Sequence, residues 1–176
     1  MNYADIKYCD VANGEGVRVS LFVSGCTHHC KECFNKEAWD FHYGEPFTQK
    51  EIDRILEYLK PNYIAGLSLL GGEPMEPVNQ EGILPLLRAV KQTYQEKNIW
   101  CYTGYLFDKD VLDKMCKESE VTKEIVSYLD IVVDGEFMID RKNLKINFRG
   151  SDNQRIIDVK KTLDAGEIVR WEREIQ

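Results

Sequence analysis

The sequence predicts an α/β fold, built as an open partial (β/α) barrel with mostly parallel strands. Apolar segments of strand length alternate with helical patterns along the chain, as is typical of parallel strands joined by helical crossovers. The chain has 176 residues, whereas a closed eightfold barrel typically needs about 250. Its composition, 43% hydrophobic and 30% charged residues, is ordinary for a globular protein. We therefore expect residues 1–176 to form one domain.

The first half of the chain is expected to contain two apolar strands with a helix between them. Val17–Val23 reads VRVSLFV, in which apolar side chains alternate as they do on one face of a strand. Thr48 and Glu51 have the spacing of a capping box, which predicts the start of a helix with an apolar stripe at positions 52, 55, 56 and 59. Tyr63–Leu70 is a continuous apolar run that ends at two glycines, so we expect a buried strand there.

The second half continues the alternation of strands and helices, and the tail is expected to contain only short strands and a turn. Its apolar runs are again short, and helical periodicity separates them. The expected elements are a helix over Gln80–Glu96, a strand over Asn98–Gly104, helices over Asp110–Cys116 and Thr122–Tyr128, a strand over Asp130–Gly135, and short strands at Ile156–Ile157 and Ile168–Val169 with a turn at Asp164–Gly166.

Short polar or glycine-containing motifs follow each of the four apolar strands. The first is a loop with three cysteines, and the others are Gly71-Gly72-Glu73, Thr103-Gly104-Tyr105 and Asp134-Gly135-Glu136. Loops at the carboxyl ends of parallel strands meet at one edge of the sheet. We therefore expect these four motifs to share one rim that carries the site, with few residues left over for a lid.

The charge balance excludes some classes of protein. With 30 acidic against 23 basic residues, the formal net charge is -7, so we expect no nucleic-acid partner, which would need a basic face. The apolar runs are far shorter than the roughly 20 residues of a membrane span, and MNYADIKYCD has no signal-peptide core. A cytoplasmic protein without a membrane partner is expected, in which the six cysteines are thiols or metal ligands.

The stretch SLFVSGCTHHCKECFNKEAW places Cys26, Cys30 and Cys33 within one loop. A disulfide uses two thiols and a closed structural zinc site uses four ligands. Three thiolates suit a cubane iron–sulfur cluster in which one iron keeps an open position. The alternative is a zinc site with His28 or His29 as fourth ligand, although both histidines are interpreted as solvent-facing loop residues.

We interpret the remaining three cysteines as free thiols without a role as metal ligands. Cys9 precedes an aspartate, Cys101 lies in an apolar strand and Cys116 in a helical segment. Each lacks a neighbouring cysteine at ligand spacing, and buried free thiols are common. We expect no second cluster from them.

The stretch LLGGEP forms the second candidate motif. Gly71 and Gly72 at a strand end allow a ligand to approach the backbone closely, and exposed carbonyls there can accept an ammonium group. Glu73 adds a negative charge. A plain turn is the alternative, but the shared rim with the cysteine loop favours a ligand site. The sequence does not decide whether Tyr102, Tyr105, Asp134 and Glu136 face this site.

Taken together, these motifs resemble a known family. CTHHCKEC matches the C-x3-C-x2-C signature of the radical S-adenosylmethionine enzymes, and GGEP matches their motif for the methionine amino group. Over about residues 12–159, GEGVRVSLFVSGC, CFNKEAWDF, GGEP, WCYTGY and RGSDNQRIIDV resemble the activating proteins of anaerobic (class III) ribonucleoside-triphosphate reductases.

The resemblance implies a partial barrel of the radical S-adenosylmethionine type and two cofactors. Its [4Fe-4S] cluster would be held by Cys26, Cys30 and Cys33. The residues that would bind S-adenosylmethionine are Gly71, Gly72 and Glu73 at the methionine portion, and Glu32 and Phe34 near the adenine. At Glu32 this chain departs from the pattern, because many superfamily members place an aromatic residue there and the activating proteins often a glycine.

The resemblance also implies the reaction and the partners. Reductive cleavage of S-adenosylmethionine would produce a radical that takes a hydrogen atom from a glycine in the large subunit of the reductase. A low-potential electron donor would supply the electron. Two alternatives stay open: a radical enzyme with a small-molecule substrate, such as a deazapurine-forming enzyme, and a zinc-binding interaction module.

Overall fold

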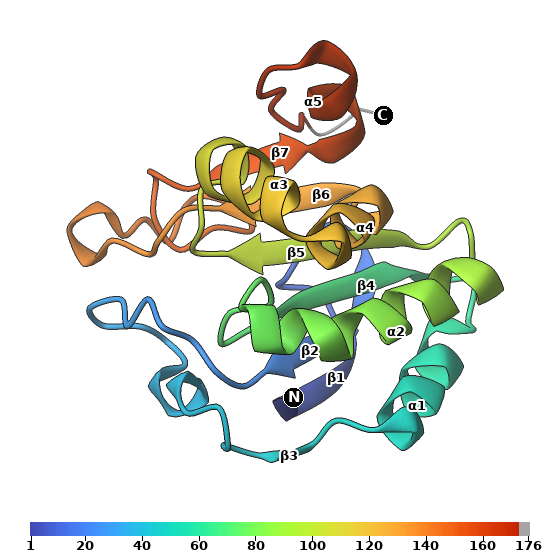
Figure 1. Cartoon of the computed structure of the whole chain (residues 1–176). Coiled ribbons are helices and arrows are strands. Elements are labelled where there is room, and N and C mark those ends of the chain that lie inside the picture. The colour runs from blue at the N-terminus through green and yellow to red at the C-terminus, as the bar shows by residue number, and fades with distance from the viewer. Residues whose placement is uncertain (173–176) are drawn as a thin grey trace.

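The computed structural model describes residues 1–172 and contains one seven-stranded sheet with strand order β3-β1-β2-β4-β5-β6-β7 (Figure 1). The strands are β1 (Asn2–Asp10), β2 (Val17–Val23), β3 (Glu45–Pro46), β4 (Ile64–Gly71), β5 (Asn98–Thr103), β6 (Ile131–Asp134) and β7 (Arg155–Asp158). The four predicted apolar strands are β2, β4, β5 and β6, and they are adjacent and parallel. The sheet is mixed at its margins, because β1 and β7 run antiparallel to their neighbours.

Helices and helical turns fill the connections. They are η1 (Lys36–Trp39), α1 (Gln49–Leu59), α2 (Pro77–Thr93), η2 (Phe107–Met115), α3 (Cys116–Glu118), α4 (Glu120–Tyr128), η3 (Ile139–Arg141) and α5 (Val159–Ala165). The α/β class is confirmed, and the sheet is open because its edge strands β3 and β7 do not pair with each other.

The predicted capping box starts α1. The Glu51 carboxylate accepts hydrogen bonds from the Thr48 backbone N–H at 2.8 Å and from its hydroxyl at 2.6 Å. These bonds lower the pKa of Glu51. Helix α2 begins three residues earlier than the predicted Gln80, because Pro77 occupies the first helical turn, where a missing N–H costs nothing.

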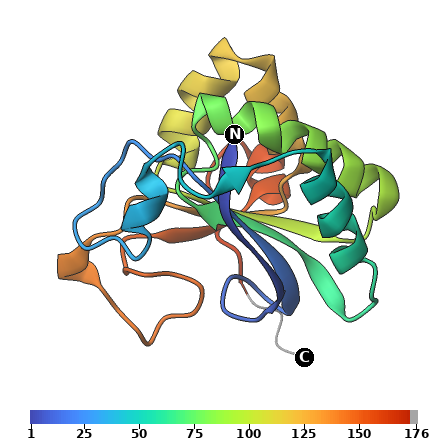
Figure 2. The ribbon, with the colours of Figure 1, turned by 90° about the horizontal axis from the view of Figure 1, so that it is seen from below.

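The two faces of the sheet differ in their covering. Helices α1, α2 and α4 lie on one side (Figure 2) and bury a large apolar cluster that includes Leu67, Leu87 and Ile125. On the other side, Trp100 packs in a smaller cluster with Phe148 and partly buried neighbours. This second face is left partly open, and it carries the site.

A buried arginine organises the open face. Arg18 is fully buried and donates from Nε to Ser68 Oγ at 2.7 Å and from Nη2 to the Leu67 carbonyl at 2.9 Å. Its guanidinium carbon lies 5.4 Å from the centre of the Trp100 ring. Ser68 Oγ in turn donates to the Asn13 carbonyl at 2.5 Å. These contacts fix the β1–β2 connection against the sheet.

The tail differs from the prediction. Ile168–Val169 does not form a strand, and only an isolated bridge joins Ile157 to Arg170. The predicted turn at Asp164–Gly166 is instead the end of α5, which the Asp158 carboxylate caps by accepting from the Lys161 N–H at 3.0 Å. Gly166, at φ 72°, terminates this helix. Within residues 1–172, no helix is both long and apolar enough to cross a lipid bilayer.

Candidate functional site

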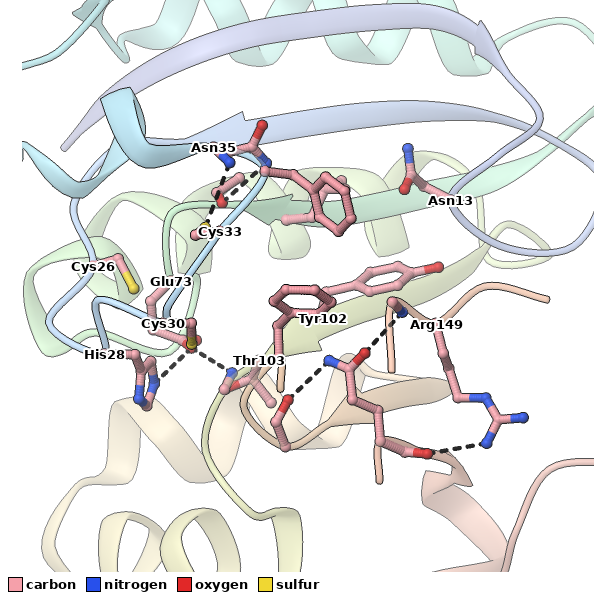
Figure 3. A pocket seen from close by; sticks show the side chains of 18 of the residues that line it. Asn13, Cys26, His28, Cys30, Cys33, Asn35, Glu73, Tyr102, Thr103 and Arg149 are labelled. Carbon is pink, nitrogen blue, oxygen red and sulfur yellow. Dashed lines mark hydrogen bonds and ion pairs between the residues drawn. The ribbon is translucent and has the colours of Figure 1, made fainter. Parts of the chain in front are cut away.

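A cavity of about 490 Å³ opens at the carboxyl ends of the parallel strands (Figure 3). All four predicted rim motifs contribute to its wall: the three cysteines, Gly71-Gly72-Glu73, Thr103-Gly104 and Gly135. The segment 144–150 forms a further wall. The expectation of a shared rim is confirmed, and the cavity is open to solvent, with the lining residues Phe34 and Leu144 65% and 82% exposed.

The cysteine loop is fixed at its base by backbone hydrogen bonds. The Gly25 N–H donates to the Ala38 carbonyl at 2.8 Å, and the Cys26 N–H donates to the Trp39 carbonyl at 3.2 Å. The loop then curls through left-handed backbone conformations, with φ 51° at His29 and 58° at Glu32. This path turns Cys26, Cys30 and Cys33 toward the same cavity.

The three thiols suit an iron–sulfur cluster chemically. Burial raises the pKa of Cys26 to about 11 and raises that of Cys30 as well, so thiolates here need cationic partners, which the irons of a cluster provide. The Asn35 N–H points to Cys33 Sγ at 3.4 Å, a contact of the kind that tunes cluster potential. Among residues 1–172, no group of His, Cys, Asp and Glu side chains surrounds a single-ion position.

His28 is not solvent-facing, and the sequence-based interpretation was wrong for it. Its Nε2 lies 3.1 Å from Glu73 Oε2, its Nδ1 lies 3.0 Å from Glu136 Oε1, and its side chain is only 10% exposed. Burial opposes the charged ring, but the hydrogen bonds to Glu73 and Glu136 raise the pKa of His28 to about 9. Both ring nitrogens are engaged by carboxylates, which disfavours His28 as a zinc ligand. His29 is exposed as predicted and stacks on Trp39.

Glu73 lies at the centre of the rim. Its carboxylate is 1% exposed and accepts from the Met75 N–H at 2.8 Å and the Gly104 N–H at 2.7 Å, besides contacting His28. Glu73 therefore ties the end of β4 to the end of β5 and to the cysteine loop. Its negative charge lies in the cavity wall, oriented by protein donors.

The glycines of this motif allow the backbone of the GGEP turn to pack closely against the backbone of the cysteine loop. The Gly72 N–H donates to the Val23 carbonyl at 2.7 Å, and the Glu73 N–H donates to the Gly25 carbonyl at 2.8 Å. A Cβ on Gly72 would lie 2.5 Å from the Gly25 oxygen and 2.7 Å from the Ala38 oxygen. Glycine is thus required at position 72 because the turn packs directly on the cysteine loop.

The two residues that flank Cys33 are placed differently. Phe34 lines the cavity, and its ring centre lies 5.1 Å from that of Phe137 and 5.2 Å from Lys142 Nζ. The Glu32 side chain is exposed, lies outside the cavity wall and approaches Lys36 at 3.7 Å. The structure therefore brings Phe34 to the cavity but not the Glu32 carboxylate.

The structure also decides the acidic residues that the sequence left open. Asp134 is fully buried and accepts from the Phe107 N–H at 2.7 Å and from Arg155 Nη2 at 2.5 Å, so it supports the rim from below. Glu136 contacts His28. Cys9, Cys101 and Cys116 are not among the residues that line the cavity.

Sequence reasoning missed the residues that hold the far wall of the cavity. Gln154 donates from Nε2 to the Gly135 carbonyl at 2.9 Å and accepts from the Gly150 N–H at 2.9 Å. Arg149 Nη1 donates to the Gln154 carbonyl at 3.0 Å. The motif RGSDNQRIIDV was the available signal, but the spacing alone does not reveal these contacts.

Residues 12–157 match the family model described as a 4Fe-4S single cluster domain, which places the chain in the class of iron–sulfur proteins with one cluster. Within this class, the chain belongs to the family of anaerobic ribonucleoside-triphosphate reductase-activating proteins.

Three relatives that carry this name illustrate the similarity. The chain is 40% identical to the protein of Pasteurella multocida over 158 residues, which cover 89% of this chain and 96% of the relative. It is 42% identical to that of Enterobacteria phage T4 over 158 residues, covering 89% and 93%. It is 38% identical to that of Escherichia coli K12 over 156 residues, covering 88% and 96%. The similarity extends over nearly the whole of each relative.

Proposed function

We propose that this chain activates an anaerobic ribonucleoside-triphosphate reductase by generating a glycyl radical on its large subunit. The observation that carries the proposal is the convergence of Cys26, Cys30 and Cys33 on one cavity that the GGEP turn also lines. The names of the relatives support the target. In this proposal the three thiolates hold a [4Fe-4S] cluster, and the protein works in the cytoplasm.

S-adenosylmethionine is the second proposed cofactor, and the residues of the cavity fit it. Gly71, Gly72 and Glu73 form the wall beside the cysteines, where the methionine portion would lie, and Phe34 offers an aromatic face for the adenine. When bound, the two cofactors would supply the chemistry: with one electron from a low-potential donor, cleavage of a carbon–sulfur bond in S-adenosylmethionine would give methionine and a radical able to take a hydrogen atom from glycine. The chain's own residues would bind and orient the two cofactors and exclude water from them.

The test is a reconstitution without oxygen. The protein, loaded with iron and sulfide, is mixed with the reductase, S-adenosylmethionine and a strong reductant, and an electron-spin-resonance spectrum is recorded. We expect a doublet on the reductase that collapses when its glycines carry deuterium at the α-carbon. Cys30→Ala should lose iron and the doublet, whereas Cys116→Ala, outside the cavity, should keep both.

Two outcomes would contradict the proposal. Formation of 5′-deoxyadenosine without any radical on an active reductase would favour a small-molecule substrate. A colourless protein that binds zinc and takes up no iron would favour the interaction module.

A further inference from the structure

The cavity extends well below the rim on which the cysteines lie. Asn13 lines the same cavity as the cysteines, and its carbonyl accepts from Ser68 Oγ. Ser68 precedes Gly71, the end of β4, by three residues, which corresponds to about 10 Å along a strand. Figure 3 shows Asn13 and Tyr102 on the side of the cavity away from Cys26 and Cys30. We call this region, between Asn13 and Tyr102, the inner end.

The inner end presents a hydroxyl without a partner. Tyr102 Oη is buried and makes no hydrogen bond within the part of the chain that the structure describes. Burial raises the pKa of Tyr102 above its usual range, so the hydroxyl remains a donor. A buried donor without an acceptor is costly, which points to a ligand that supplies one.

Asn13 provides the complementary group. Its Nδ2 donates to Asp10 Oδ2 at 2.6 Å, which orients the amide and leaves Oδ1 as an acceptor. The inner end therefore combines one donor, on Tyr102, with one acceptor, on Asn13. A peptide backbone carries the matching pair, a carbonyl oxygen and an N–H.

One wall of the cavity presents apolar side chains. Leu144, Ile146 and Phe148 line the cavity from one side, and Phe148 packs edge-on against Trp100 with ring centres 5.4 Å apart. Leu144 is 82% exposed, so this wall has apolar surface that a docked segment would cover, and a glycine suits it because glycine brings no side chain. The proposed adenine position lies beside Phe34, which follows Cys33 and is 65% exposed, so it is on the solvent-exposed side of the cavity.

We propose that the inner end binds the backbone of the substrate glycine segment, with the Tyr102 hydroxyl donating to a peptide carbonyl and Asn13 Oδ1 accepting a peptide N–H. This inference rests on the proposed function and adds the residues that recognise its protein substrate. Tyr102 and Asn13 position the segment and take no part in the radical chemistry.

The first test is Tyr102→Phe, which removes the hydroxyl and keeps the ring. Because this hydroxyl has no protein partner, we expect the thermal midpoint to stay the same or to rise. A synthetic peptide covering the radical-glycine segment of the reductase should bind roughly three- to tenfold more weakly. The KM for the reductase should rise by the same factor, while kcat at saturation and the affinity for S-adenosylmethionine should not change.

A matched control and a double mutant sharpen the result. Tyr94 lies on the helix-covered side and donates to the Leu56 carbonyl at 3.1 Å, so Tyr94→Phe should lower the thermal midpoint and leave peptide binding unchanged. If one peptide group bridges Tyr102 and Asn13, the losses in Tyr102→Phe and Asn13→Ala should be non-additive in the double mutant.

Two outcomes would overturn the inference, and a third would contradict only the proposed function. A Tyr102→Phe variant that loses affinity for S-adenosylmethionine while binding peptide normally would assign the inner end to the cofactor. A variant in which neither affinity changes would show that the hydroxyl recognises nothing. A wild-type protein that binds the peptide but forms no radical would contradict the proposed function alone, since the binding assay does not depend on the radical.

Discussion

At the scale of single residues, Gly72 shows how structure changes the reason for a prediction. The sequence suggested that a glycine here makes space for a ligand. The structure shows that a Cβ would meet the Gly25 oxygen at 2.5 Å and the Ala38 oxygen at 2.7 Å. Both atoms belong to the backbone that begins and ends the cysteine loop. A side chain at position 72 can therefore be accommodated only if the loop itself moves.

We therefore expect Gly72→Ala to reduce the iron content as well as the affinity for S-adenosylmethionine. The measurement is iron and sulfide per chain after reconstitution. Gly166→Ala is the control, because Gly166 also resists substitution, with φ 72°, but a Cβ there meets nothing within 4 Å. That variant should lose about 1 kcal/mol of stability and keep its iron. Full iron content in Gly72→Ala would show that the loop tolerates displacement.

A second residue-scale prediction concerns His28. Its charged ring pairs with Glu73, whose carboxylate is 1% exposed. Replacing His28 by Leu leaves that carboxylate without its cation, and breaking a buried pair costs roughly 3–5 kcal/mol. We expect a large fall in the urea midpoint of the metal-free protein. His42→Leu should change little, since His42 is 94% exposed; an equal effect in both variants would refute the role of the buried pair.

At the scale of elements, Arg155 in β7 joins two other parts of the chain. Its Nη2 lies 2.8 Å from Asp108 Oδ1 in η2 and 2.5 Å from Asp134 Oδ2 in β6. The hydrogen bond from Arg155 lowers the pKa of Asp108. A carboxyl whose pKa is lower in the folded state stabilises that state above its unfolded pKa and ceases to do so as the pH falls through the folded value.

Asp108→Asn should therefore be less stable than the wild type at pH 7, and the difference should shrink as the pH falls below the ordinary aspartate pKa of about 4. Urea midpoints of the metal-free protein between pH 7 and pH 2.5 measure this difference. Asp140→Asn, at an exposed position, provides the control and should show no such convergence. A gap that stays constant with pH would mean that the substitution acts through packing.

Whether an individual helix or strand could be predicted depends on the sequence pattern of that segment. The run IAGLSLL in β4 is apolar except for Ser68, because the strand is buried along most of its length, so the strand was visible in the sequence. Strand β1 was not predicted, because as a strand near the sheet edge it carries polar and exposed residues. In the tail, Asp158 caps a helix where hydrophobicity alone suggested a turn between strands.

The site likewise has some features that the sequence predicts and others that only the structure reveals. The cysteine spacing and the glycine motif are local patterns, and their shared rim follows from the parallel topology. The contacts of His28 with Glu73 and Glu136 span 45 and 108 residues, and no local pattern encodes such pairs. The Tyr102 hydroxyl and Asn13 likewise meet one cavity only because β5 and the β1–β2 connection lie on the same face.

At the scale of the whole molecule, the core and the site lie on different sides of the sheet. The large apolar cluster is formed between the sheet and helices α1, α2 and α4, and its fully buried members include Leu21, Ile55 and Leu86. The cysteines lie at the end of the sheet and on loops. Folding of the core therefore should not require the cluster, in contrast to small zinc domains, which unfold without their metal.

We accordingly expect the metal-free protein to keep its far-ultraviolet circular dichroism and a cooperative thermal transition. Loading with iron and sulfide should raise the transition, because a ligand that binds only the folded state stabilises it. Amide hydrogen exchange should slow mainly at residues 24–40, 71–74, 103–105 and 135–137, which form the rim, while exchange in α2 and β4 should change little. If chelation of the iron instead unfolded the sheet, the core could not be independent of the cluster, and the protein would be a metal-dependent fold rather than a preformed scaffold whose loops alone the cluster orders.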